Sequence, residues 1–166
     1  MSPHNAVTRR QALLALSVLG SLAARAAREP APRFRARSLD GEQFDNDSIK
    51  GRVVLVQFWA TWCPYCRREQ GIIDSLVRDL SSKGLLVLAV NVGESRKKVA
   101  KYLQDSPRAC KVVLTDDTNL AALFAPRTFP AYVVIGSDGG VAGRQNGAAG
   151  EDALRQLLAK AGLDEE

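Results

Sequence analysis

The sequence predicts an α/β fold, in which a central mixed β-sheet is flanked by helices on both faces. Two observations lead to this class. Runs of β-branched and apolar residues, as in strands buried on both faces, alternate with segments of helical periodicity over most of the chain. Near the end, two strand-like segments are joined by a glycine-rich turn, which indicates an antiparallel hairpin. The length of 166 residues, with 46% apolar and 25% charged residues, suits one globular domain.

The first elements of the domain are a short hairpin, a buried strand and a helix. Asp40-Gly41 supplies the positive φ angles of a tight turn between two short strands. The run VVLVQFWA, residues 53 to 60, is β-branched and aromatic, as in a strand with both faces covered. A helix is expected over residues 64 to 80, because Pro64 is tolerated in the first turn of a helix. A strand therefore leads directly into a helix.

The remaining elements follow from the same signals of periodicity and turn residues. No internal repeat is visible in the sequence. In chain order, we expect a buried strand over 85–92, a charged helix over 95–104, a strand over 111–114, a short helix over 119–124, a hairpin of 131–135 with 141–145, and a helix over 151–161.

The N-terminus has the pattern of an export signal. Arg9-Arg10 precedes the apolar run ALLALSVLGSLAA, which ends in the small-residue pattern Ala24-Arg25-Ala26. This run is shorter than the roughly 20 residues that a membrane span needs. TRRQALL resembles a twin-arginine signal. The choice between this route and the general export route stays open, and an uncleaved N-terminal anchor is the alternative.

These features set the expected organisation of the chain and its location. We expect cleavage after Ala26 and a periplasmic protein. The next residues, in EPAPRFRAR, are proline-rich and basic, as in a linker that leads into the domain. The expected parts are a signal peptide over 1–26, a linker over 27–33 and one domain over 34–162.

Charge and histidine content narrow the classes of function. The net charge is +5, but the first 26 residues contribute three arginines and no acid, so the rest has 20 basic and 18 acidic residues. This balance does not indicate a nucleic-acid partner or a membrane surface. Cleavage after Ala26 removes His4, the only histidine, which excludes Ser-His and Cys-His catalysis and metal sites with histidine ligands. Thiol chemistry leads the classes that remain.

Cys63 and Cys66 stand in FWATWCPYCRREQ, at the junction of the buried strand and the helix. A zinc site needs four ligands, and Cys110 alone does not complete the set. A structural disulfide across two residues closes only a tiny loop and stabilises little. Redox exchange accounts for both spacing and setting, because a helix N-terminus favours a thiolate at Cys63. We favour the redox interpretation. Cys110 fits a buried, inert thiol, and an intermolecular disulfide at this odd cysteine stays the alternative.

The motif FWATWCPYC, together with Phe129-Pro130 before the closing hairpin, resembles the thioredoxin superfamily over about residues 34 to 158. DGEQF, KGRVVLVQFWATWC and NVGES are similar to the exported reductases related to TlpA and ResA. The resemblance implies a thioredoxin-like fold with an N-terminal β-hairpin and an extra βα insertion between Cys66 and Pro130. It also implies a thiol–disulfide oxidoreductase that needs neither a cofactor nor a metal.

The resemblance assigns roles to the residues of the site. Cys63 is the attacking thiol and Cys66 the resolving thiol of a redox-active disulfide. Pro130 matches the cis proline that lies against this disulfide in the family. Pro64-Tyr65 between the cysteines suggests a less reducing pair than that of thioredoxin. The residues expected to shape the site are Trp62, Pro64, Tyr65 and Phe129, the last being a departure from the smaller or β-branched residue usual before the proline.

Glu69 falls within the apolar stripe of the helix over 64–80, between Leu76 and Cys66. An acid there is costly to ionise, so we expect Glu69 to hold or deliver a proton near neutral pH. The resemblance agrees, since ResA-like reductases carry a glutamate at this spacing, and Gln57 replaces the acid found in thioredoxins. Glu69 therefore joins Cys63, Cys66 and Pro130 as a catalytic residue. The alternative is a first-turn glutamate that is favoured by the helix dipole and paired with an arginine.

The leading hypothesis is an exported thiol–disulfide oxidoreductase that reduces disulfides of periplasmic protein clients. The resemblance implies a client in cytochrome c maturation, such as apocytochrome c or a component that handles haem or copper. It also implies a membrane thiol reductase of the DsbD or CcdA type as electron donor, and we expect a monomer. Two alternatives stay open. One is a periplasmic oxidant or isomerase, and the other is a copper- or haem-binding module that uses the two cysteines as ligands.

Overall fold

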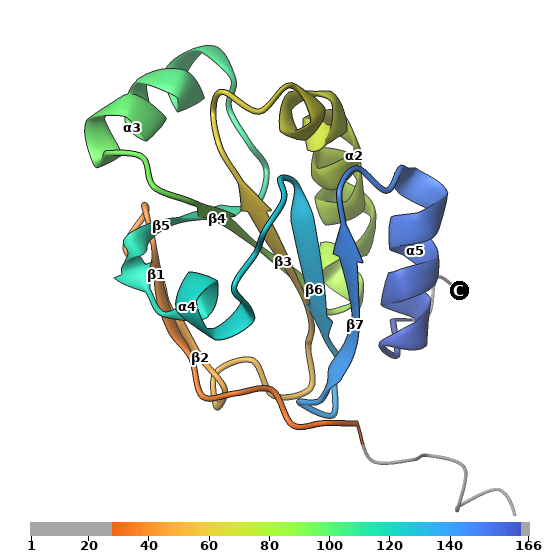
Figure 1. Ribbon diagram of the computed structural model, residues 1–166. Coiled ribbons are helices and arrows are strands. Elements are labelled where there is room, and N and C mark those ends of the chain that lie inside the picture. The colour runs from red at the N-terminus through yellow and green to blue at the C-terminus, as the bar shows by residue number, and fades with distance from the viewer. Residues whose placement is uncertain (1–27, 164–166) are drawn as a thin grey trace, which may run out of the picture.

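The computed structural model of the protein describes residues 28–163 and has the predicted α/β architecture (Figure 1). The expected signal peptide, 1–26, lies outside the described residues. No helix within 28–163 combines the length and the apolar character that crossing a membrane requires. In chain order, the elements are β1 (Arg35–Ser38), β2 (Gln43–Asp45), β3 (Val53–Trp59), α2 (Pro64–Leu80), a 3₁₀ turn (Ser81–Lys83), β4 (Leu85–Asn91), α3 (Arg96–Asp105), β5 (Lys111–Thr118), α4 (Leu120–Phe124), β6 (Ala131–Ile135), β7 (Val141–Asn146) and α5 (Glu151–Lys160).

One mixed sheet organises these elements, in the strand order β2-β1-β5-β4-β3-β6-β7. β3, β4 and β5 are parallel neighbours, whereas β1, β6 and β7 pair antiparallel. Every residue of β3 and β4 is buried, as their continuous apolar runs predict. The residues after β3 therefore lie at the carboxyl edge of the parallel strands, where open α/β sheets place their functional sites.

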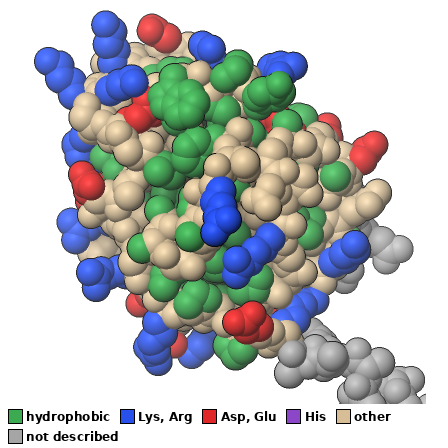
Figure 2. Space-filling view, in the orientation of Figure 1, with side chains coloured by type: hydrophobic (Ala, Val, Ile, Leu, Met, Phe, Trp, Pro, Cys, Tyr) green, Lys and Arg blue, Asp and Glu red, His purple; other side chains and the backbone are tan. Residues whose placement is uncertain are grey.

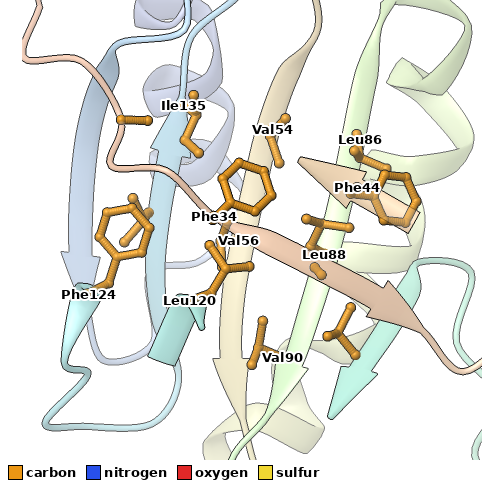
Figure 3. Packing of buried hydrophobic residues seen from close by; sticks show 14 of the residues in the cluster. Phe34, Phe44, Val54, Val56, Leu86, Leu88, Val90, Leu120, Phe124 and Ile135 are labelled. Carbon is orange, nitrogen blue, oxygen red and sulfur yellow. The ribbon is translucent and has the colours of Figure 1, made fainter. Parts of the chain in front are cut away.

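The two faces of the sheet are covered by different elements. On one face, Phe34 and the short helix α4 pack against Val54 and Val56 of β3 (Figure 3). On the other face, Leu55 of β3 packs in a second cluster with side chains of α2 and α5, such as Ile73 and Leu154. The alternation along β3 follows from the two-residue period of a strand. Helices on both faces confirm the predicted class.

β5 is longer than the sequence predicts. The apolar pattern ends at Leu114, but the strand continues to Thr118. Ala36 of β1 pairs with Thr118 and Ser38 pairs with Val113, with a register shift between the two pairs. The extra residues, 115–118, form a strand because they pair with the distant segment β1. Their own sequence, TDDT, has no apolar alternation from which the strand could be predicted. Between α2 and the proline lie two strands, β4 and β5, and two helices, α3 and α4, which include the extra strand–helix unit expected there.

The segment assigned to a linker, 27–33, is packed on the domain over the residues that the structure describes. The Arg28 guanidinium forms a salt bridge of 3.0 Å with Asp138, and the Ala31 N–H donates to the Gly139 carbonyl oxygen at 3.0 Å. A Cβ atom at Gly140 would lie 2.5 Å from the Cβ of Arg28. The small residues of the GSDGG turn thus let segment 28–33 pack closely against the domain. The domain boundary at residue 34 stays a prediction.

A substitution at Gly140 tests this contact. We expect Gly140→Ala to lower the free energy of unfolding by about 1–2 kcal/mol, because the methyl group forces Arg28 away. Trypsin should also cleave within 28–33 faster than in the parent protein. Gly71→Ala is the matched control, since a methyl group at this exposed position of α2 meets no neighbour and alanine is the better helix former. Equal tryptic protection in both variants would contradict the packing.

Candidate active site

A disulfide joins Cys63 and Cys66 at the start of α2. Cys63 is the N-cap residue of the helix, with extended backbone angles, and its Sγ accepts a hydrogen bond of 3.1 Å from the Cys66 N–H. The Cα atoms are 5.3 Å apart, and each residue is only 2% exposed. A helix N-terminus presents unpaired N–H groups and a positive dipole end. The same position favours a thiolate at Cys63 once the disulfide is reduced.

The loop before β6 lies against this disulfide. The Phe129–Pro130 peptide bond is cis, as the resemblance implies. The Phe129 carbonyl oxygen is 3.5 Å from the Cys63 Sγ, although 66 residues separate them in the chain. Pro130 is buried and directly precedes β6, which pairs with β3 next to the cysteines. The structure therefore brings the cysteine pair and Pro130 into one site.

The rim of the site is aromatic and faces solvent. Trp62 is 61% exposed, and its ring lies 6.0 Å from that of Phe129 in an edge-on contact. Tyr65 is 53% exposed, with the Arg68 guanidinium 4.3 Å from its ring centre. Pro64 is the first residue of α2. The two buried sulfur atoms thus lie beside exposed aromatic side chains.

Glu69 is buried within α2, as its place in the apolar stripe predicts, with only 4% of its surface exposed. One carboxylate oxygen accepts hydrogen bonds from the Ala149 N–H at 2.7 Å and the Gly150 N–H at 2.6 Å. The other accepts from the Tyr132 hydroxyl. Glu69 lies in the second turn of α2, and no arginine pairs with it within 28–163. Backbone and phenol donors therefore satisfy this carboxylate, and its role in proton transfer stays a prediction.

A buried polar network extends from Glu69 to Arg108. Gln57, which is fully buried on β3, donates to the Tyr132 hydroxyl at 3.3 Å and accepts from Arg108 at 2.5 Å. The Arg108 guanidinium also stacks 4.4 Å from the Trp59 ring. Burial, and then the hydrogen bond to Glu69, raise the pKa of Tyr132, so its phenol stays protonated and donates.

This network was not predicted from the sequence. Arg108 stands in the polar segment SPRAC and has the pattern of a solvated charge, and Tyr132 fits a core strand. Only the buried amide of Gln57, in an otherwise apolar run, signals that polar partners must be nearby. Cys110 is partly buried, and burial raises the pKa of its thiol. Its expected inertness stays a prediction.

Glu94 fixes the loop that leads into the cysteines, a contact that was also not predicted. Its carboxylate accepts from the Thr61 N–H at 2.7 Å and the Thr61 hydroxyl at 2.6 Å. It also accepts from Asn91 at 2.7 Å and pairs with Lys98 at 2.7 Å, and its side chain is 4% exposed. Burial opposes ionisation, but the donors from Lys98, Thr61 and Asn91 outweigh it and lower the pKa of Glu94 to about 2. The only hint of this role in the sequence is an acidic residue, Glu94, in NVGES, shortly after a buried strand.

Comparisons with known proteins agree with this geometry. Residues 26–158 match the family described as Redoxin. The chain is 27% identical to the thiol-disulfide oxidoreductase ResA of Bacillus subtilis, over 77% of this chain and 72% of that protein. It is 33% identical to the thiol:disulfide interchange protein DsbE of Escherichia coli, over 61% of this chain and 57% of that protein. A crystal structure of a thioredoxin-family thiol:disulfide interchange protein from Chlorobium tepidum has a TM-score of 0.71 and 27% identity, and the match covers 83% of this chain and 99% of that chain.

The ionised Glu94 carboxylate predicts a pH-dependent contribution to stability. We expect Glu94→Ala to lower the free energy of unfolding by about 2–3 kcal/mol at pH 7, because Thr61 and Asn91 lose a buried acceptor. A lowered folded pKa means that the contribution is complete above the ordinary value of 4.5 and is lost as the pH falls through about 2. Urea unfolding curves between pH 7 and 2 measure the difference in free energy of unfolding between the parent protein and Glu94→Ala, which should become smaller as the pH falls.

The control for Glu94 is a glutamate in an exposed ion pair. Glu42→Ala removes a carboxylate that pairs with Lys111 at the surface, where its side chain is 50% exposed. Such exposed pairs contribute about 0–1 kcal/mol, so this variant should unfold close to the parent protein. If Glu94→Ala had the same small effect as Glu42→Ala at pH 7, Glu94 would not fix the Thr61 loop.

Proposed function

This chain belongs to the redoxin family and is a thiol–disulfide oxidoreductase, and from that premise we propose that it reduces disulfides of protein clients through Cys63 and Cys66. The observation that carries the proposal is the cysteine pair at the N-terminus of α2, with the Phe129 carbonyl oxygen 3.5 Å from the Cys63 Sγ. The Cys63 sulfur thus lies at a helix N-terminus, a position that favours a thiolate, and beside a polypeptide backbone. An extended client segment can bind beside such a backbone and bring its disulfide to the sulfur.

The proposed reaction begins with the reduced pair. The Cys63 thiolate attacks one sulfur of the client disulfide, the client S–S bond breaks, and the released client sulfur takes up a proton. Cys66 then loses its proton and attacks the Cys63 sulfur, which releases the second client thiol. Two electrons have moved to the client, and the Cys63–Cys66 disulfide remains, as in the structure. A dithiol donor must reduce this disulfide before the next cycle.

Glu69 is proposed to handle the proton of Cys66. Glu69 follows Cys66 by three positions along α2, so the two side chains lie on the same side of the helix. Glu69 is buried, and its carboxylate is held by Tyr132 and two backbone N–H groups, so it has a defined position. Gln57, at the alternative acid position, carries no titrating group.

Location, client and donor are proposals that rest on the sequence pattern and the resemblance. The signal-like 1–26 supports export to the periplasm with cleavage after Ala26. The resemblance to exported reductases supports a client in cytochrome c maturation and a membrane thiol reductase of the DsbD or CcdA type as electron donor. A monomer is sufficient, because one chain supplies both cysteines and the proline loop.

Trapping the mixed disulfide tests the client and the direction of electron flow. In Cys66→Ala, Cys63 still attacks a client disulfide, but no second thiol resolves the product, so client proteins stay covalently attached. We expect these adducts on non-reducing gels after the reduced variant is mixed with an extract of oxidised periplasmic proteins. Cys63→Ala is the control and should trap far less. Equal trapping by both variants would show that Cys63 is not the attacking thiol.

The proton role of Glu69 predicts a change in pH dependence. We expect Glu69→Gln to shift the pH profile of Cys63 alkylation by iodoacetamide in the reduced protein, because the ionising neighbour of the pair is gone. Tyr132→Phe is the matched control, since it removes one donor to Glu69 and leaves the carboxylate and both backbone donors in place. Identical profiles for the parent protein and Glu69→Gln would overturn the role.

A further inference from the structure

A pocket opens beside the proline loop, on the face of the sheet that α4 covers. Its volume is about 390 Å³. The floor is apolar and includes Phe58 of β3 and Phe124 of α4, and the loop residue Thr128 lines its edge. Arg127 from the loop and Arg144 from β7 complete the wall. In Figure 2, basic side chains lie over hydrophobic surface near the connection from α4 to β6.

The charge of this pocket is unbalanced. Arg127 and Arg144 are both exposed, and no acidic side chain lines the pocket. Within residues 28–163, neither arginine forms a salt bridge, and the contact of Arg144 is with the Phe124 ring, at 5.3 Å. Three other arginines within 28–163 do have acid partners, namely Arg28, Arg96 and Arg155. Two unpaired guanidinium groups over an apolar floor favour a ligand with a carboxylate and an apolar part.

The pocket is continuous with the redox site along the chain. Thr128 and Ala131 line it, and between them lie Phe129, whose carbonyl oxygen is 3.5 Å from the Cys63 Sγ, and Pro130. An extended chain advances about 3.3 Å per residue. A client segment that extends from Cys63 along the proline loop would reach the pocket within a few residues.

We propose that this arginine pocket, defined by Phe58, Phe124, Arg127, Thr128 and Arg144, binds an acidic side chain of the client segment, a few residues from the client cysteine. The inference rests on the proposed reduction of protein disulfides and names the sequence class of the preferred client. The carboxylate pairs with Arg127 and Arg144, and an apolar neighbour of the acid covers the Phe124 ring. Specificity then comes from a charge at a fixed distance from the reacting sulfur.

The test uses a set of short peptides with one central cysteine, blocked as a mixed disulfide with 2-mercaptoethanol. A glutamate is moved through the four positions on each side of the cysteine, and each peptide has matched glutamine and lysine versions. Prereduced parent protein in excess is mixed with each peptide, and acid-quenched samples give the second-order rate constant. At one or two positions, we expect glutamate to react about five-fold faster than glutamine, and lysine to react more slowly.

Charge variants assign the preference to the pocket. Arg127→Gln/Arg144→Gln should remove the difference between glutamate and glutamine, and Arg127→Glu/Arg144→Glu should favour lysine. Arg37→Gln/Lys101→Gln loses the same charge from exposed side chains outside the pocket and should keep the preference for glutamate. These six substitutions are at exposed positions, so the fold is retained.

The two levels of the hypothesis fail in different ways. If the parent protein reduces all peptides at equal rates, the pocket has no role in recognition, while the reductase function stands. A preference for glutamate that persists in Arg127→Gln/Arg144→Gln also overturns the pocket. If no peptide disulfide is reduced at any position, the proposed function itself is wrong.

Discussion

The position of Cys63 at the N-terminus of α2 is the constraint on which the rest of the site depends. It requires that the strand before the helix be immobile, and β3 meets this need because all seven of its residues are buried. It requires that the short loop between them have one conformation, which the Glu94 carboxylate provides through Thr61. It also places the sulfur against the proline loop, where the Phe129 carbonyl oxygen lies 3.5 Å away. A strand, an insert and a distant loop therefore converge on one atom.

Next to the Cys63 site, ionisable side chains are joined to one another by a network of hydrogen bonds. The Arg108 guanidinium is joined to the Glu69 side chain through the Gln57 amide and the Tyr132 hydroxyl. An amide suits the middle of such a chain, since its oxygen accepts from the guanidinium while its nitrogen donates to the phenol. A carboxylate at position 57 would pair directly with Arg108 and leave Tyr132 without this donor. The network thus explains why a neutral residue can occupy this buried place on β3.

The sequence predicts what depends on local pattern and misses what depends on distant partners. The bounds of α2 follow from its apolar stripe and from Pro64, and the burial of Glu69 follows from its place in that stripe. The cysteine spacing indicates redox chemistry, and the resemblance identifies the cis proline. In contrast, Thr61 and Glu94 are 33 residues apart, and Gln57 and Arg108 are 51 residues apart. The sequence of either segment alone does not indicate its partner, because these contacts form only when the sheet brings separate segments together.

The sulfur atoms and the side chains around them differ sharply in exposure, which bears on how the proposed clients would be selected. Both cysteines are 2% exposed, whereas Trp62 is 61% exposed and touches Phe129. In the proposed reaction, a client disulfide would reach Cys63 only after its own chain has bound to the aromatic rim and the proline loop. Because exchange requires the three sulfur atoms to meet in a defined geometry, every contact that orients the client segment raises the rate of attack. Selectivity among clients then resides in the surface around the sulfur, while the chemistry of the sulfur itself stays the same for all of them.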